Sequence, residues 1–287
     1  MNVCLVLVTH NRLEYTRKCL ERLLSDNISN FDLYIWDNAS TDETPSYLRD
    51  GISDARIRQV ILHKANPGPT FAINQIWSAT KAELVGKVDN DCLLSAGWVN
   101  TLATAHRDVP SLGAIACWHF RAEDFKEEIA ARKIQRYGQH SVFRHPWICG
   151  CGFLLKRTTF IRMGPCSQGD RRYGLTGYFL DMALAGYTNG WYYPLVYQEH
   201  MDDPLSSHCL FKDDASMQAL KEVTYTMRTH NIKTYAQRLK RRAFVLRNLL
   251  YGPADPRQYI GWRSKARRLL PRLDEWRWRA SQCLSRV

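Results

Sequence analysis

Two aspartates, Asp89 and Asp91, stand one residue apart directly after segment 83–88, which is predicted to be a strand. At a strand end the backbone can turn both carboxylates toward one cleft. Such a pair can hold a hard divalent cation, which leaves other coordination positions for phosphate oxygens. The ion would stabilise a diphosphate as it leaves. The spacing alone is a weak signal, because the same residues also occur in solvated turns.

Two more polar clusters follow predicted strands, at residues 9–12 and 37–42. Apolar periodicity and capping residues predict the surrounding elements. The predicted strands are 3–8, 31–36, 58–62 and 83–88, and the predicted helices are 13–25, one that begins at 40–45, and 70–80. Alternating strands and helices indicate a parallel sheet with helices on both faces. Ligands of such sheets bind at the carboxyl ends of the strands, so we expect the three clusters to line one site.

The later part of the chain predicts further strands and then helices. Segment 145–155 is interpreted as a strand with glycines where another backbone or a ligand comes close. Segment 192–197 is also strand-like, and His200 follows it. Beyond residue 211 the pattern is helical and increasingly basic.

Five groups of residues follow one another along the chain. They are Val8-Thr9-His10-Asn11-Arg12, Trp36-Asp37-Asn38-Ala39-Ser40-Thr41-Asp42, Asn66-Pro67-Gly68 with Asn74, Lys87-Val88-Asp89-Asn90-Asp91, and Gly150-Cys151-Gly152-Phe153-Leu154-Leu155-Lys156-Arg157 followed by Met163-Gly164. Together they resemble glycosyltransferase family 2, the inverting enzymes with a GT-A fold, and the resemblance keeps chain order over about residues 3–200.

The resemblance implies a GT-A type α/β fold, with a Rossmann-like, mostly parallel sheet flanked by helices. It also implies a nucleotide-sugar-binding half over 1–105 and an acceptor-binding half over 106–210 of one catalytic domain. Residues 211–287 would form a basic helical extension. The implied activity is metal-dependent, inverting transfer of a sugar from a nucleotide-diphosphate donor to a hydroxyl of a glycan or lipid-linked acceptor, in the biosynthesis of surface polysaccharide.

Site residues follow from the matched motifs. Asp37 would accept a hydrogen bond from a uracil or thymine imide, which favours a UDP- or dTDP-sugar; a strand-ending Asx turn explains Asp37 as well, and presents the same carboxylate. The implied ligands of Mn²⁺ or Mg²⁺ are Asp91, Asp89 and His200, although a lone histidine is as often structural. The residues implied to contact the donor are Thr9, Asn11, Arg12, Asp37, Asn66, Gly68, Asn74, Asp89 and Asn90.

An inverting enzyme needs a general base that deprotonates the acceptor hydroxyl. In the family this is an acidic residue in a glycine- and aromatic-rich stretch, which corresponds here to residues 177–187. Asp181 is the only acid in that stretch and is the predicted base. Leu180 replaces the family's usual Glu, and no Arg lies between Asp181 and Gly186, so the register differs from the family pattern. The alternative is an aspartate that only stabilises a helix N-terminus.

The net charge of +12 is concentrated at the carboxyl end, where fourteen Lys and Arg and three acidic residues lie between Arg238 and Arg286. Tryptophans and leucines are interleaved with these cations, a composition that suits an anionic lipid interface. The alternative is a helical appendage packed on the core. Nucleic acid is the least favoured partner, because no recognition fold accompanies the charges.

The sequence also suggests a location. It contains no run of about 20 apolar residues, and its apolar start is interpreted as a buried strand instead of a signal peptide. Its nine cysteines indicate free thiols in a reducing compartment. We therefore expect a cytoplasmic protein, peripheral on the inner face of a membrane.

Two other functions fit parts of the pattern. A sugar nucleotidyltransferase also uses acidic residues and a metal, but would carry a glycine-rich basic loop after the first strand, where residues 9–12 differ. A non-catalytic nucleotide- or glycan-binding homologue would lack the base.

Overall fold

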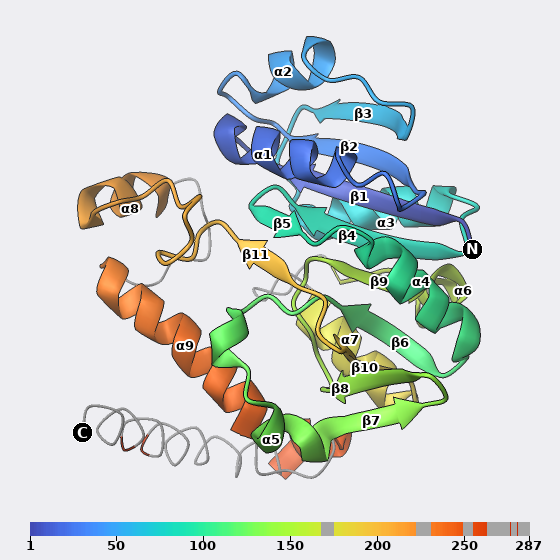
Figure 1. Cartoon of the computed structure of the whole chain (residues 1–287). Coiled ribbons are helices and arrows are strands. Elements are labelled where there is room, and N and C mark those ends of the chain that lie inside the picture. Colours follow the sequence, from blue (N-terminus) through green and yellow to red (C-terminus); the bar gives the residue numbers. More distant parts are fainter. Residues whose placement is uncertain (168–174, 222–230, 249–254, 263–275, 277–279, 281–287) are drawn as a thin grey trace.

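The protein is a three-layer α/β/α structure built on one nine-stranded sheet (Figure 1). The computed structural model describes residues 1–167, 175–221, 231–248, 255–262, 276 and 280. The strand order in the sheet is β3-β2-β1-β4-β9-β6-β10-β8-β7. The strands are β1 (Val3–Thr9), β2 (Asp32–Asn38), β3 (Ile57–His63), β4 (Leu84–Asp89), β5 (Cys92–Leu94), β6 (Leu112–Ala116), β7 (Ile134–Tyr137), β8 (His140–Arg144), β9 (Phe153–Lys156), β10 (Thr188–Tyr193) and β11 (Gln198–His200).

Helices cover both faces of the sheet. They are α1 (Leu13–Leu24), α2 (Thr44–Asp50), α3 (Pro69–Ala79), α4 (Trp98–Asp108), α5 (Glu127–Ala130), α6 (Arg157–Met163), α7 (Leu175–Leu184), α8 (Asp214–Lys221) and α9 (Ile232–Asn248), with short 3-10 turns η1 (Ala122–Asp124), η2 (Ala131–Lys133) and η3 (Pro256–Tyr259). The four strands and three helices predicted in the first 90 residues are confirmed, with ends that differ by a few residues.

Alternate side chains of the strands enter two separate cores, as the period of two in a strand requires. Leu5 and Leu7 of β1 pack with α1 and α4 on one face. Val6 and Val8 pack with α3, α6 and α7 on the other face. Because both faces are covered, the first and fourth strands are nearly continuous apolar runs, as expected for a buried parallel sheet.

The parallel register aligns the predicted polar clusters. Thr9 of β1 pairs with Asp37 of β2, and Val8 pairs with Asp89 of β4. The carboxyl ends of these three neighbouring strands therefore meet at one edge of the sheet.

Segment 145–155 differs from the prediction, because only its last residues are in a strand. β9 begins at Phe153 and runs antiparallel to both β4 and β6. The preceding residues form turns, where the ring of His145 bonds to the backbone of Trp147. Gly152 has φ +60, and a side chain there would collide with Gln198.

A second, two-stranded sheet is formed by β5 and β11, which pair in antiparallel fashion. The strand-like segment 192–197 is divided, because β10 ends at Tyr193 and β11 begins at Gln198. His200 pairs with Cys92, so the chain returns beside the acidic run more than a hundred residues later.

The described part of the region beyond residue 211 is helical, as predicted. Most of segment 249–287 lies outside the described residues. Within the described part, no helix is both long enough and apolar enough to span a membrane.

Candidate active site

The loops after β1 and β2 are tied together by hydrogen bonds. The backbone N–H of Asn11 donates to Ser40 Oγ at 2.6 Å, and Asn11 Oδ1 accepts from the backbone N–H of Thr41 at 2.7 Å. Asp37 accepts from both the backbone N–H and the hydroxyl of Ser40. Asp37 is 1% exposed, so its carboxylate is held in the turn that the sequence suggested.

Thr9 and Asn90 form the buried underside of the site. Asn90 Nδ2 donates to Thr9 Oγ1 and to Thr16 Oγ1, both at 3.0 Å. The Thr9 and Thr16 hydroxyls also bond to each other at 2.8 Å. These contacts direct both predicted donor-binding side chains into the protein, where they join the strand ends of β1 and β4.

Asp91, His200 and Asp202 form a cluster that could hold a metal ion. One ligand atom from each lies within 4.8 Å of the other two. His200 Nε2 is 3.6 Å from Asp91 Oδ2. Pairing of β11 with β5 creates this cluster, since His200 ends one strand and Asp91 precedes the other.

Arg12 lies against the same two carboxylates. Its guanidinium is 2.6 Å from Asp202 and 3.4 Å from Asp91, and it stacks on the ring of Tyr15 at 4.3 Å. The side chain is only 7% exposed. Arg12 has φ 65, a left-handed conformation at the residue before α1. Asp42, from the loop after β2, accepts the backbone N–H of Leu13 and so takes the place of a local helix cap.

The charges of the cluster are strongly coupled. Burial opposes ionisation of Asp91, but the positive charge of His200, its hydrogen bond and Arg12 lower the pKa of Asp91 far below its usual range. Burial likewise opposes protonation of His200, but Asp91 raises the pKa of His200 to about 9. Burial raises the pKa of Asp202, and Arg12 opposes this shift. The cluster thus gathers two acids around cationic partners.

The donor set suits a Mn²⁺-type ion. Two carboxylates and one imidazole combine oxygen and nitrogen ligands, which manganese accepts and which magnesium, with its preference for oxygen, uses less often. An ion bound there would compensate the buried negative charge that Arg12 and His200 compensate in this structure.

The Asp89 carboxylate is paired with a lysine and does not belong to the Asp91–His200–Asp202 cluster. Its carboxylate forms an ion pair with Lys87 Nζ, and Lys87 also donates to the carbonyl of Gly150 at 3.0 Å. Burial opposes the charge on Lys87, which is 3% exposed, but Asp89 raises its pKa. Lys87, whose charge Asp89 balances, therefore connects β4 to Gly150 of segment 145–155. Asp202, instead of Asp89, lies beside Asp91 and His200.

The loop from β3 to α3 contains the remaining predicted donor residues. Asn66 is exposed, and its side chain accepts the backbone N–H of Gly68 at 3.1 Å. Gly68 has φ 88 where α3 begins. Asn74 is instead buried and exchanges two hydrogen bonds with the backbone of Cys166, at 2.8 and 2.9 Å. Its amide therefore joins α3 to the segment after α6 and does not line an open site.

Asp181 lies outside this arrangement. Leu175, at the start of α7, lies close to Gly150. Tyr187, just beyond the end of the helix, lies close to Gly113 near the start of β6. Asp181 is about 9 Å along the helix axis from Leu175, and its side chain is exposed. It forms no hydrogen bond or ion pair with another described side chain. The role of Asp181 as a base stays a prediction.

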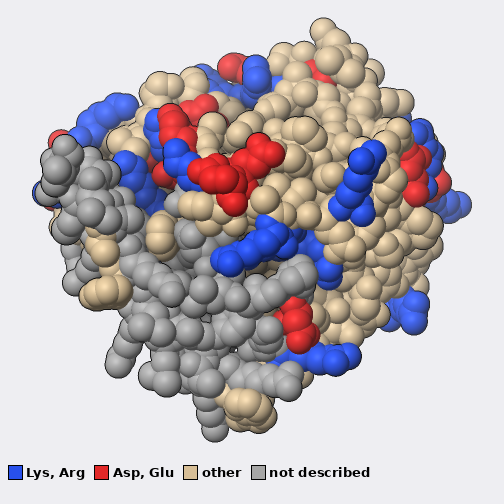
Figure 2. Space-filling view, turned by 60° about the horizontal axis from the view of Figure 1, so that its bottom comes forward, with Lys and Arg blue, Asp and Glu red and all other residues tan. Residues whose placement is uncertain are grey.

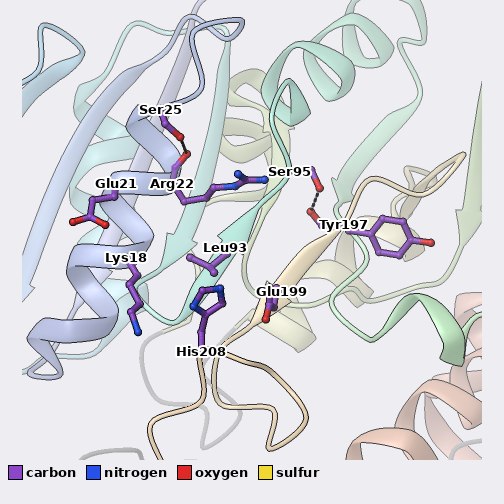
Figure 3. A pocket seen from close by; sticks show the side chains of 9 residues that line it. All are labelled: Lys18, Glu21, Arg22, Ser25, Leu93, Ser95, Tyr197, Glu199 and His208. Atoms are coloured by element: carbon purple, nitrogen blue, oxygen red, sulfur yellow. Dashed lines mark hydrogen bonds between the residues drawn. The ribbon is translucent and has the colours of Figure 1, made fainter.

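Two hollows flank the β5–β11 sheet. A cleft of about 670 Å³ lies between α1 and the outer face of this sheet, on the side of Leu93 and Glu199. Figure 3 shows Lys18, Leu93, Glu199 and His208 around it, while the ring of Tyr197 points away. A smaller hollow of about 210 Å³ borders the Asp91–His200–Asp202 cluster, because His200 lines it together with His119, Phe120 and Arg121.

The family of the chain follows from its sequence. A sequence description of the family "Glycosyl transferase family 2" matches residues 4–173, more than half of the chain. The chain belongs to glycosyl transferase family 2. The matched segment contains the strand-end clusters and Asp91, and it ends before His200 and Asp202.

Solved glycosyltransferase structures share the fold. The mannosyltransferase PcManGT from Pyrobaculum calidifontis, in complex with GDP-Man and Mn²⁺, superimposes with a TM-score of 0.53 at 22% identity, over 66% of this chain and 54% of PcManGT. TarS from S. aureus gives 0.54 at 13% identity, over 71% of this chain and 37% of TarS. A shorter TarS chain in complex with UDP gives 0.52 at 13% identity, over 69% and 60%. The chain thus spans less than two thirds of each, and this similarity establishes the GT-A fold.

Sequence reasoning missed Asp202. The residue stands two positions after His200, in a stretch that contains several acids. The available signal was the group of acids beside His200, a predicted metal ligand. Only the pairing of β11 with β5 selects Asp202 over Glu199 and Asp203.

Proposed function

We propose that this protein is a metal-dependent glycosyltransferase that moves a sugar, with inversion, from a nucleoside-diphosphate donor to a hydroxyl of a glycan or lipid-linked acceptor. The observation that carries the proposal is the Asp91–His200–Asp202 cluster at the strand ends of a family 2 fold. Mn²⁺ or Mg²⁺ held by this cluster would neutralise the diphosphate as the sugar leaves.

The chain's own residues would position the donor around that ion. Asp37 lies at the neighbouring strand end, where it would select a uracil or thymine base by accepting an imide N–H. Asn11, Asn66 and Gly68 belong to the loops at the same edge and would border the donor. Thr9, Asn74, Asp89 and Asn90 would act indirectly, by holding these loops and the segment around Gly150 in place. Surface polysaccharide biosynthesis is the proposed setting, and nucleic acid is not a proposed partner.

A nucleotide screen tests the proposal. Thermal unfolding of the full chain is measured with UDP, dTDP, GDP and ADP, each with Mn²⁺, Mg²⁺ or EDTA. We expect one uracil or thymine nucleotide to raise the midpoint only when the metal is present, because a ligand that binds the native state alone stabilises it. No metal-dependent shift with any of the four would refute the donor site. Nucleotide binding without any donor hydrolysis or transfer would favour the non-catalytic alternative.

The predicted base has its own test. Asp181→Asn removes the carboxylate with little change in volume, and a true base contributes about 10²–10⁴-fold to the rate. If Asp181 is the base, transfer falls by at least about a hundredfold while metal-dependent nucleotide binding is unchanged. Unchanged transfer would show that Asp181 is an exposed residue of α7 without a role as base. Glu128→Gln on α5 serves as the control for loss of an exposed acid.

We propose further that the basic carboxyl end brings the protein to the inner, cytoplasmic face of a membrane. The composition of 238–287 supports this, although most of these residues lie outside the described part. Figure 2 shows acidic side chains grouped on one face of the molecule and flanked by Lys and Arg, so the described residues do not form a continuous basic surface in that view. Lipid contact would therefore depend on the carboxyl end itself. Cosedimentation of the full chain with phosphatidylglycerol vesicles, against phosphatidylcholine vesicles as the control, tests it, and binding to neither would refute the membrane role.

A further inference from the structure

The segment that follows β6 runs beside the start of β11. Two backbone hydrogen bonds, of 2.7 and 2.9 Å, join Trp118 to Val196 and Gln198. His119 is the next residue after Trp118, and His200 lies two residues beyond Gln198. Both histidines line the hollow of about 210 Å³ that borders the cluster that could hold a metal ion. The hollow is therefore next to the position proposed for the donor diphosphate.

The ring of His119 is held by aromatic side chains and not by hydrogen bonds. Its centroid lies 4.0 Å from that of Phe120, and it stacks on Trp191 at 6.1 Å. Nδ1 is buried, and neither ring nitrogen forms a hydrogen bond with another described residue. Burial lowers the pKa of His119 to about 3, so the neutral ring offers one N–H donor and one acceptor nitrogen. A hydroxyl of a molecule in the hollow can pair with this ring.

The polar rim of the hollow is already organised by hydrogen bonds. Arg121 pairs with Glu123 at 2.8 Å and donates to the carbonyl of Leu205 at 3.1 Å. The hydroxyl of Ser206 donates to Glu199 at 2.6 Å. These contacts join the segment after β6 to the loop after β11, so both walls are fixed before a ligand binds. A rim that is ordered in advance lowers the entropic cost of binding.

The size and the lining of the hollow suit one uncharged ring. Its volume of about 210 Å³ is below the range of about 300–1,000 Å³ for sites that enclose a drug-sized ligand. Phe120 and Tyr197 line it, and the negative faces of aromatic rings attract the polarised C–H groups of a sugar. Apart from the histidines, its charged groups are three carboxylates and one guanidinium, which is paired with one of the three. This excess of acids disfavours a phosphate or carboxylate group.

We infer that the hollow binds the acceptor of the proposed transfer as a neutral sugar ring, and that His119 forms a hydrogen bond with one of its hydroxyls. The inference rests on the proposed function and names the class of acceptor: a sugar without a phosphate or carboxylate on the ring that enters the hollow. Among the described residues that line the hollow, none is a residue proposed to border the nucleotide. The acceptor and the nucleotide thus occupy different sides of the cluster.

The test measures the binding of single sugars to the full chain by saturation-transfer NMR titration, without nucleotide and then with it. The neutral probes are the methyl glycosides of glucose, galactose, mannose and N-acetylglucosamine, and the charged probes are glucose 6-phosphate and glucuronic acid. We expect at least one neutral glycoside to bind more tightly than both charged sugars. No binding by any neutral glycoside, or equal binding of a charged sugar, would overturn the inference.

Histidine variants test the contact itself. His119→Phe keeps an aromatic ring without nitrogen and should weaken glycoside binding about fivefold, the scale for one hydrogen bond between neutral groups. His119→Gln provides an amide in its place and should recover part of the affinity. His208→Phe is the matched control, because His208 lines the larger cleft, and should bind glycoside as the wild type does. An equal loss in both Phe variants, or a lower unfolding midpoint of His119→Phe with no recovery in His119→Gln, would overturn the assignment.

A final comparison separates the acceptor from the sugar of the donor. Affinities are measured with Mn²⁺ for the nucleoside diphosphate that the thermal screen selects and for its glucose ester. We expect His119→Phe to leave both unchanged, and a selective loss of the glucose ester would assign the hollow to the donor sugar and overturn the inference. If the wild type binds no nucleotide, the proposed donor site fails, whereas glycoside binding measured without nucleotide still decides the role of the hollow.

Discussion

Asp91→Asn is expected to lower Mn²⁺ affinity at least about a hundredfold and to abolish the metal-dependent stabilisation by nucleotide. Asp91 is the acid that the family motif predicts as a metal ligand and that the structure groups with His200 and Asp202. Removal of a partner that only supports a ligand already costs about 10–100-fold. Asparagine keeps the volume but has one neutral oxygen in place of the carboxylate. Calorimetric titration of Mn²⁺, followed by nucleotide titration at saturating Mn²⁺, measures both effects.

Two further variants make this experiment decisive about the ligand set. Asp202→Asn should reduce Mn²⁺ affinity to a similar extent, whereas Asp89→Asn should have a smaller effect, because the Asp89 carboxylate is paired with Lys87. Asp32→Asn, which removes an acid paired with Arg58 on the surface, should leave the affinity unchanged. A larger loss for Asp89→Asn than for Asp202→Asn would contradict the cluster described above and restore the ligand set expected from the sequence.

Arg12→Gln is expected to lower the free energy of unfolding by about 3 kcal/mol in EDTA, the scale for breaking a buried ion pair by removing one partner. The variant leaves Asp91 and Asp202 close together and without the guanidinium that contacts both. Mn²⁺ should restore much of the loss, because the ion supplies the missing positive charge. Added Mn²⁺ should therefore stabilise the variant more than the wild type, which urea unfolding with and without the ion would measure.

The control for this prediction is Arg17→Gln, on the same helix. Arg17 is exposed and stacks on Tyr47, so its loss should change stability by about 0.5 kcal/mol or less and leave the response to Mn²⁺ unaltered. Equal stability of Arg12→Gln and wild type in EDTA would show that the two carboxylates do not depend on this arginine. A Mn²⁺ response no larger than that of the wild type would show that Arg12 and the ion do not compensate the same charge.

Local sequence patterns were sufficient to predict the strands and helices that position the site. Hydrophobic periodicity reports which residues of a single strand or helix are buried, and the first four strands are short, apolar and followed by turn residues. Once their order was known, the rules for parallel sheets placed Thr9, Asp37 and Asp89 at one edge, as the register confirms. The family motifs added the prediction that Asp91 is a metal ligand, which the spacing alone could not support.

The directions in which individual polar side chains point could not be obtained in that way. Thr9, Asn74 and Asn90 stand in the same motifs as Asn11 and Asp37, yet their side chains satisfy buried partners. A motif records the residue type at a position and not whether the side chain faces the cleft or the interior. Asp181 illustrates the same limit, since its stretch is helical and the period of the helix turns the carboxylate to the surface.

By itself, then, the sequence determined the family, the order of strands and helices and the edge of the sheet at which chemistry can occur, because these depend on contacts between neighbours in the chain. Only the tertiary structure decided which side chains form the Asp91–His200–Asp202 cluster and which charges surround it. Arg12 and Asp202 are 190 residues apart, and they meet because β11 returns to pair with β5.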